Sequence, residues 1–259
     1  MVLRVLLTAL MCTGMLLAQG PVCVSISPNP VILGQSSITV TVTDSTGAGF
    51  QHWNNCVARS IHQDFPNGAA AGIPLGLCGP WTTAAPYASV TKVFPFTAGL
   101  QVGHYYVKVG TRPAAGGPEV LTWAPFDVQV TGDPTLTAQT NLQVGQTWSV
   151  DLAAPAFPGT PYIVAASYST NVGFALPTGQ LVSLDMNNAL FDLTWPVASS
   201  AFFGNFFSVT DATGTATGIN AYVPNIPSLA YLPVYLQCGL LSTGGGVSLT
   251  NVVSACILP

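Results

Sequence analysis

Short runs of alternating apolar and polar residues recur along the chain. Ile38, Val40 and Val42, for example, alternate with threonines. A period of two places successive side chains on opposite faces of a β-strand. The runs with this period lie at 38–42, 104–109, 126–130, 148–152 and 231–238. Gly and Pro clusters separate them, and no run after residue 20 has the period and end signals of an amphipathic helix. The pattern predicts an all-β protein of sandwich or barrel type.

A short repeat suggests that the strands form two units. Gly34-Gln35 precedes one alternating strand, and Gly145-Gln146, 111 residues later, precedes another. That spacing is about the length of one immunoglobulin-type domain. The Gly and Pro of the segment 131–134 would end the last strand of a first unit. We therefore predict two tandem β-sandwiches, one over 21–132 and one over 133–259.

Several turn-and-strand pieces carry a resemblance to known domains. Ser-Pro-Asn-Pro at 27–30, with the Gly-Gln turn and Thr/Val strand that follow, resembles the opening of bacterial immunoglobulin-like domains. The stretch 99–109 resembles their penultimate strand, in which a Tyr follows a Gly turn. Residues 134–259 resemble a β-sandwich module at the C-termini of many secreted bacterial proteins of unassigned function. The pieces that match this module are 145–146, 161–162, 211–214, 224–227, 236–237 and 249–251. These resemblances imply tandem immunoglobulin-like folds and export, and they bring no catalytic residues.

The first 20 residues have the pattern of a signal peptide. Arg4 precedes the apolar stretch 5–17, and Ala18-Gln19-Gly20 offers small residues for cleavage. The alternative is a retained anchor, but the apolar stretch is shorter than the ~20 residues that a spanning helix needs. We expect a protein that is secreted or held at the cell surface. Later runs are too short to predict membrane insertion after signal removal.

Charge is sparse and unevenly distributed. After residue 20, four basic residues stand against nine acidic ones, a net charge of −5, and residues 113–259 contain no Lys or Arg. Nucleic-acid binding is excluded because a phosphate backbone needs many cationic partners. Anionic membrane surfaces are disfavoured for the same reason.

Five cysteines remain after the signal, and an oxidising compartment favours disulfides between them. Cys56 and Cys78 bracket a loop and form one predicted pair. Cys238 and Cys256 lie on strands near the chain end and form the other, provided that a bulge near Asn251 turns Cys256 inward. Cys23 is left over, either buried as a small apolar residue or displacing one member of the loop pair. No metal site and no cofactor are expected, because the spacings CxxC and HxxxH do not occur.

The connection 44–88 is unusually long and is rich in Gly, Ala, Pro and Asn. Loops of this length inside compact domains are usually binding loops or disordered, and the cysteine pair argues for order. Its candidate ligand-binding residues are Trp53, Trp81, His52 and His62, whose rings could stack on a sugar. The competing interpretation is that these aromatics cap one end of the sandwich as a small second core.

No catalytic motif occurs, since GxSxG, HExxH and phosphate-binding Gly-rich patterns are all missing. We therefore expect a secreted or cell-surface structural or adhesive protein without catalytic activity. The alternative function is a carbohydrate-binding module that uses the loop aromatics. Charged residues normally protect sheet edges from pairing, and the second unit has no Lys to do so. We therefore expect the structural or adhesive protein to associate with itself or to dock onto cell-envelope proteins. If the protein is a carbohydrate-binding module instead, its partner would be a glycan.

Overall fold

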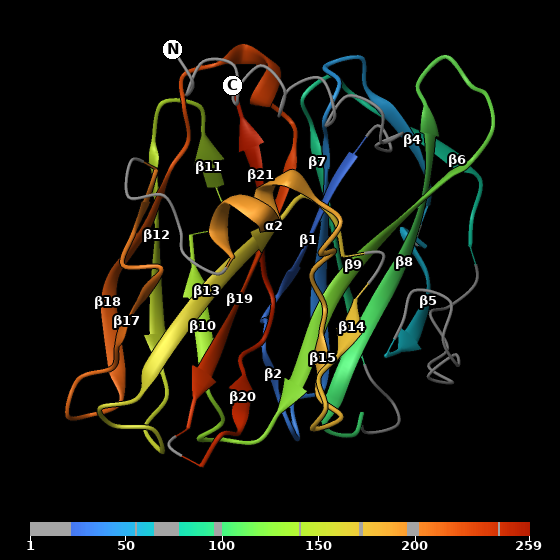
Figure 1. Ribbon diagram of the computed structural model, residues 1–259. Coiled ribbons are helices and arrows are strands. Elements are labelled where there is room, and N and C mark those ends of the chain that lie inside the picture. Colours follow the sequence, from blue (N-terminus) through green and yellow to red (C-terminus); the bar gives the residue numbers. More distant parts are fainter. Residues whose placement is uncertain are drawn as a thin grey trace.

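The computed structural model describes residues 22–54, 56–64, 78–95, 100–139, 141–170, 173–195, 202–242 and 244–259. Their regular secondary structure is almost entirely β-strand, which confirms the predicted fold class (Figure 1). The predicted signal peptide lies outside the described residues. Within the described residues, no helix has the length and apolar character needed to cross a membrane.

The first sandwich packs two sheets around one core. One sheet has the order β1-β3-β7, with β1 at Val22–Ser27, β3 at Ser37–Asp44 and β7 at Ser89–Pro95. The other has the order β2-β9-β8-β4-β6, with β5 also paired to β8. Its strands are β2 (Val31–Ile32), β4 (Phe50–Trp53), β5 (Ala58–Gln63), β6 (Trp81–Ala84), β8 (Gly103–Pro113) and β9 (Val120–Gln129). The described strand pairs of both sheets are antiparallel, except the parallel pair β2–β9. Ile38, Val40 and Val42 of β3 are fully buried in the core, as their alternation predicts.

The second sandwich also has two main sheets. One has the order β10-β12-β18-β16, with β10 (Thr135–Ala138), β12 (Thr147–Ala153), β16 (Phe203–Gly204) and β18 (Thr215–Tyr222). The other has the order β11-β21-β19-β13-β17, with β20 also paired to β19. Its strands are β11 (Asn141–Gln143), β13 (Pro161–Ser167), β17 (Phe207–Val209), β19 (Pro233–Leu241), β20 (Val247–Leu249) and β21 (Val253–Leu258). Trp148 lies at the centre of the core and donates its indole N–H to the Gln139 carbonyl at 2.8 Å.

A hairpin covers the outer face of the β13–β19 sheet, and a helix lies at the β13 edge, where the Ala166 N–H donates to the Thr194 hydroxyl at 2.9 Å. The helix places Leu190 in the inner core and Phe191 in the cluster on the outer face. The hairpin is β14 (Phe174–Ala175) with β15 (Leu181–Val182), and the helix is α2 (Ala189–Thr194); a 3₁₀ turn lies at Pro227–Leu229. Leu184, Phe191 and Val252 pack there against Ala165 and Tyr235 of the sheet. This helix was not predicted from the sequence, because six residues are too few to show a helical period. Its signal was Asn188, whose side chain accepts the Leu190 N–H at 3.0 Å and so caps the first turn.

The connection 44–88 is not one long loop, which corrects the sequence-based expectation. It contains β4, β5 and β6, and its residues 55 and 65–77 lie outside the described residues. The alternation of β4 escaped notice because its inward and outward residues are not sorted by polarity. His52 points inward beside the buried Phe50, whereas Trp53 points outward.

The two sandwiches lie side by side, and each sheet takes its strands from one side of the segment 131–134 (Figure 1). The domain limits themselves stay a prediction. A disulfide between Cys23 of β1 and Cys256 of β21 joins the two sandwiches.

The predicted Cys238–Cys256 pair is therefore wrong, while the predicted Cys56–Cys78 pair is confirmed. Cys238 is a free thiol that points into the second core. Strand β21 alternates without a bulge and buries Val253, Ala255 and Ile257 on its inner face. Cys256 therefore points away from Cys238 and bonds to Cys23. This pairing differs from both predictions for Cys23, which were burial as a small apolar residue and displacement of one member of the loop pair.

Candidate functional site

The most chemically distinctive surface is the outer face of the sheet that contains β8. Strand β8 alternates, so that Tyr105, Val107 and Val109 enter the core and the residues between them face outward. Lys108 and Arg112 therefore lie on the outer face, together with Trp123 of β9 and Trp53 and Trp81 of β4 and β6. We call this surface the cation–indole face; its members are Trp53, Arg59, Trp81, Lys108, Arg112, Glu119 and Trp123.

Two of its tryptophans are cross-strand neighbours. Register pairs Trp53 with Trp81, and their ring centroids lie 4.3 Å apart at an interplanar angle of 31°. The Arg59 guanidinium lies over Trp53 with its carbon 5.3 Å from the ring centroid, and Arg112 lies 4.3 Å from that of Trp81. The contacts thus run in series from Arg59 through both indoles to Arg112. Each cation–π contact contributes about 0.5–1 kcal/mol at an exposed site.

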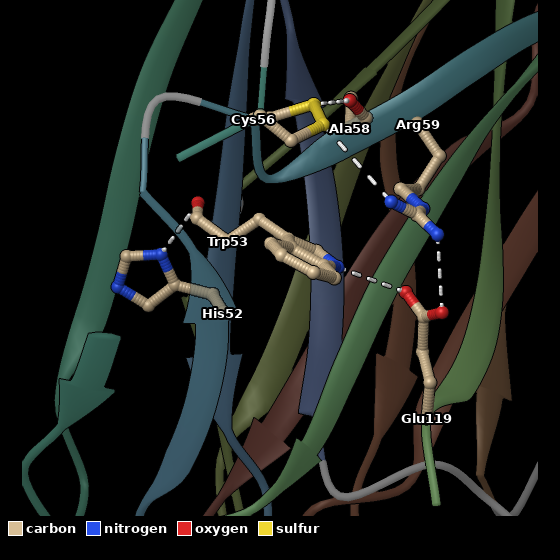
Figure 2. Close-up of a disulfide and its surroundings, with 7 residues drawn as sticks. His52, Trp53, Cys56, Ala58, Arg59 and Glu119 are labelled. Carbon is tan, nitrogen blue, oxygen red and sulfur yellow. Dashed lines mark hydrogen bonds and ion pairs between the residues drawn. A yellow bond between two sulfur atoms is a disulfide. The ribbon is translucent and has the colours of Figure 1, made fainter. Parts of the chain in front are cut away.

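Hydrogen bonds fix both ends of this series. One Glu119 oxygen pairs with Nη2 of Arg59 at 3.2 Å, and the other accepts the Trp53 indole N–H at 3.3 Å (Figure 2). At the other end, Nε of Arg112 donates to the Gln51 side-chain oxygen at 2.6 Å. The Glu119 carboxylate lies across Gly110, where a β-carbon would come within 2.0 Å of its oxygen. The glycine thus provides the space that lets Glu119 reach both partners.

The Cys56–Cys78 disulfide lies beside the series. It links the residues after β4 to those before β6, so that it ties together the ends of the two strands that carry Trp53 and Trp81. Nη1 of Arg59 also contacts Sγ of Cys78 at 4.0 Å. The disulfide therefore supports the spacing of the two indoles.

A second aromatic group lies further along the same face. Lys108 is paired in register with Ser60 on one side and Trp123 on the other. Its ammonium lies 5.2 Å from the Trp123 ring centroid. The His62 ring meets Trp123 edge-on at 5.1 Å, and its Nε2 is 2.7 Å from the Ser60 hydroxyl.

The structure brings together only part of the predicted ligand-binding set. Trp53 and Trp81 are in contact, and His62 lies beside Trp123. His52 points to the other side of β4, is 6% exposed and packs against Phe50 (Figure 2). It is therefore part of the first core, and ligand binding by the other three residues stays a prediction.

The residues that organise this face were not predicted from the sequence. Arg59, Lys108, Arg112, Gly110 and Glu119 were not among the candidates. The available signal was that every basic residue after the signal lies between 59 and 112, close to the selected tryptophans. Among the described residues, no three His, Cys, Asp or Glu side chains lie close enough together to hold a metal ion.

A second polar cluster lies buried between the two sandwiches. One Asp127 oxygen is 2.6 Å from Nδ1 of His104, and the other accepts the Val252 N–H at 2.8 Å. Asn29 accepts the Asp127 N–H at 3.2 Å and donates to the Val252 carbonyl. Asn251 donates to the Asn29 carbonyl at 3.4 Å. We call this set the junction network.

Tyr106 adds a further contact between the sandwiches. Its hydroxyl donates to the Thr170 carbonyl at 3.0 Å. Burial, together with the nearby negative charge of Asp127, raises the pKa of the Tyr106 hydroxyl far above its usual value. The phenol is therefore neutral at any physiological pH and acts as a permanent donor across the junction.

Comparison with known proteins gives little further information. The sequence matches no known protein family, and no curated protein matches it. Among solved structures it is similar to Escherichia coli alpha-2-macroglobulin activated by porcine elastase, with 10% identity and a TM-score of 0.31. The match covers 93% of this chain and 24% of the other, so the chain spans about a quarter of that protein's length. A similarity this small carries no argument about function.

Proposed function

We propose that the protein is a secreted or cell-surface structural or adhesive module that acts by binding and without catalysis. The observation that carries this proposal is the Cys23–Cys256 disulfide between the first strand of one sandwich and the last strand of the other. Stable disulfides are typical of proteins that work in an oxidising compartment outside the cytosol. A covalent bond between the two sandwiches suits a part that must hold its shape outside the cell.

The junction network supports a rigid role for the pair of sandwiches. Asp127, Asn29 and the Val252 backbone exchange hydrogen bonds in a buried setting. Separation of the sandwiches would exchange each of these hydrogen bonds for one to water, at a net cost of about 0.5–1.5 kcal/mol per bond. The network therefore favours one relative orientation, which suits a spacer or scaffold better than a hinged enzyme.

The geometry does not favour a neutral-sugar platform at Trp53 and Trp81. Sugar rings bind to indoles by stacking on an exposed ring face. Here the two indoles contact each other at a tilt, and a guanidinium lies over each of them. A sugar would have to displace one of these neighbours. Other copies of the chain or envelope proteins are therefore the partners that we propose first.

Expression of the 259-residue chain in a bacterium with an oxidising periplasm tests the proposal. We expect the protein in the periplasmic fraction or the medium, with Cys23 and Cys256 recovered as one linked peptide under non-reducing conditions. Recovery from the cytosol alone with reduced cysteines would contradict export. Turnover of a substrate that co-purifies with the homogeneous protein would contradict a purely binding role.

A further inference from the structure

The cation–indole face holds most of the basic residues in the described part of the chain. Four basic residues lie in the described part, and three of them are on this face, while Lys92 is on β7 of the other sheet. Arg59 is paired with Glu119. Lys108 and Arg112 have no carboxylate partner among the described residues. Tryptophan and arginine are also the residue types that dominate binding energy at protein interfaces.

A surface of opposite character lies in the second sandwich. Residues 185–195, which we call the acidic segment, contain Asp185 and the exposed Asp192. They also expose two large apolar side chains, Met186 at 47% and Trp195 at 46%. Residues 133–259 contain five Asp and no Lys or Arg, so this half of the chain offers no cation to neutralise the segment.

Both surfaces lie on the same side of the molecule. The acidic segment includes α2, whose Phe191 packs in the cluster on the outer face of the β13–β19 sheet while its Leu190 enters the inner core. Tyr106 projects from the outer face of β8 and reaches Thr170, just before the hairpin that lies beside α2. The outer faces of the two sheets therefore adjoin, and Figure 1 shows α2 and the hairpin on the same side as β8 and β9.

We propose that two copies form a closed dimer in which the cation–indole face of each docks on the acidic segment of the other. Because the two surfaces adjoin on one side, a two-fold axis through that side brings each surface onto its complement, which closes the assembly at two copies. The dimer pairs Lys108 and Arg112 with Asp185 and Asp192 and covers the exposed Trp195. This inference rests on the proposed binding role, for which it names the partner.

Sedimentation velocity of the oxidised chain without its signal, over a range of concentrations and salt, tests the dimer. We expect a monomer–dimer equilibrium that weakens as salt rises, because exposed charge pairs are screened. A monomer at every concentration overturns the proposal, and so does an open series of larger species, which a two-fold contact does not produce.

Charge reversal identifies the surfaces. Lys108→Glu makes the face repel the acidic segment, and Asp192→Lys makes the segment repel the face. Each variant alone should raise the dimer Kd about tenfold or more. Mixed together, they should form a heterodimer, because the altered face meets the altered segment and the two native surfaces meet each other. Failure of the mixture to associate overturns the proposed pairing.

Two control variants make the same changes in net charge elsewhere. Lys92→Glu lies on the other sheet of the first sandwich, and Asp151→Lys lies on β12, away from α2. Neither should change the dimer Kd, and equal weakening by the controls would show a net-charge effect and overturn the proposal. Thermal unfolding checks that every variant is folded, and Lys108→Gln replaces Lys108→Glu if the latter is not.

The same variants separate this proposal from other outcomes. If the chain stays monomeric and binds a polyuronate in a manner that requires Lys108, the face is a site for acidic glycans and not for a second copy. Export of Lys108→Glu should match that of the parent chain. If the parent chain were not exported, the proposed function would be contradicted. The dimer, which is measured by sedimentation, would not be affected by that result.

Discussion

The two sheets on one side of the molecule differ in their outer faces: one is apolar and covered by the chain, and the other is lined by aromatic and basic side chains. The β13–β19 sheet presents apolar residues such as Ala165 and Tyr235, and the chain covers them with the hairpin and Phe191 of α2. The neighbouring β8 sheet carries indoles under guanidinium and ammonium groups, and no described helix covers it. An apolar face requires a cover because water contact costs about 25 cal/mol per Å² of apolar surface.

Side-chain chemistry thus explains why one face is covered by its own chain. On the β8 sheet, the long basic side chains lay their charged ends over the aromatic rings and keep access to water. Such a face is stable when exposed and remains available to a partner. The covered face contributes to stability, and the open face is suited to recognition, so substitutions should have larger stability effects on the former.

Loss of packing between α2 and the outer face of the β13–β19 sheet should lower the free energy of unfolding most. Phe191→Ala deletes a buried ring of α2 that contacts Phe174 and Trp195. We expect the free energy of unfolding in urea to fall by about 3–5 kcal/mol. Met186→Ala, at a side chain that is 47% exposed in the same segment, should change it by less than about 0.5 kcal/mol. Similar losses in the two variants would show that the segment is not a cover.

Removal of the Cys23–Cys256 disulfide should cause the second-largest loss of stability. Replacement of Cys23 and Cys256 together by Ser removes the cross-link and should lower the free energy of unfolding by about 2–4 kcal/mol. We also expect unfolding to separate into two transitions, because the sandwiches have separate cores. The paired replacement of Cys56 and Cys78 lies within one sandwich and should not separate the transitions. A single transition in both variants would contradict independent cores.

A smaller loss is expected on the open face. Gly110→Ala places a β-carbon 2.0 Å from a Glu119 oxygen and should displace the carboxylate from Arg59 and Trp53. The expected destabilisation is about 1–3 kcal/mol, with a change in near-ultraviolet circular dichroism from the indoles. Gly244→Ala has nothing within 4 Å of the added carbon and serves as the control. An unchanged spectrum for Gly110→Ala would mean that Glu119 does not order the indoles.

Local patterns were enough to predict the strands, because a period of two can be recognised within a few residues. The buried Ile38, Val40 and Val42 show that this inference was sound. Disulfide pairing depends instead on which sheet face meets which domain, and this is a long-range property. Cys238 and Cys256 are near in sequence but lie on opposite faces of their sheet, whereas Cys23 is 233 residues from its partner.

The site shows the same limit. Trp53 and Trp81 were selected from their residue type and their place in the chain, and their contact follows from strand register, which no short window contains. Glu119 and Gly110 acquire their roles only when β8 and β9 pair. The concentration of basic residues at 59–112 was visible in the sequence, but its confinement to one sheet face required the fold.

Asp44 shows a different way to bury a polar group, and it has a pH signature. Its carboxylate is 1% exposed and accepts the N–H groups of Thr46, Gly49 and Tyr87 at 2.8–3.0 Å. Burial acts to raise the pKa of this carboxyl, but the hydrogen bonds outweigh it, so the folded pKa is lower than usual. The folded state therefore binds fewer protons than the unfolded state near the usual Asp pKa of about 3.9.

The lowered pKa of Asp44 predicts the smallest of the stability effects, and this effect depends on pH. The charged Asp44 stabilises the fold fully above a pH of about 4, and its contribution is lost as the pH falls through the lowered folded pKa. Asp44→Asn should cost about 1 kcal/mol at neutral pH, because one amide oxygen cannot accept every donor. Urea unfolding from pH 7 to pH 2 should show the two proteins converging in acid. Asp64→Asn makes the same chemical change at an exposed position and serves as the matched control. If the difference in free energy of unfolding between the parent and Asp44→Asn stayed constant with pH, the hydrogen bonds would not depend on the charge of Asp44. That result would contradict the prediction.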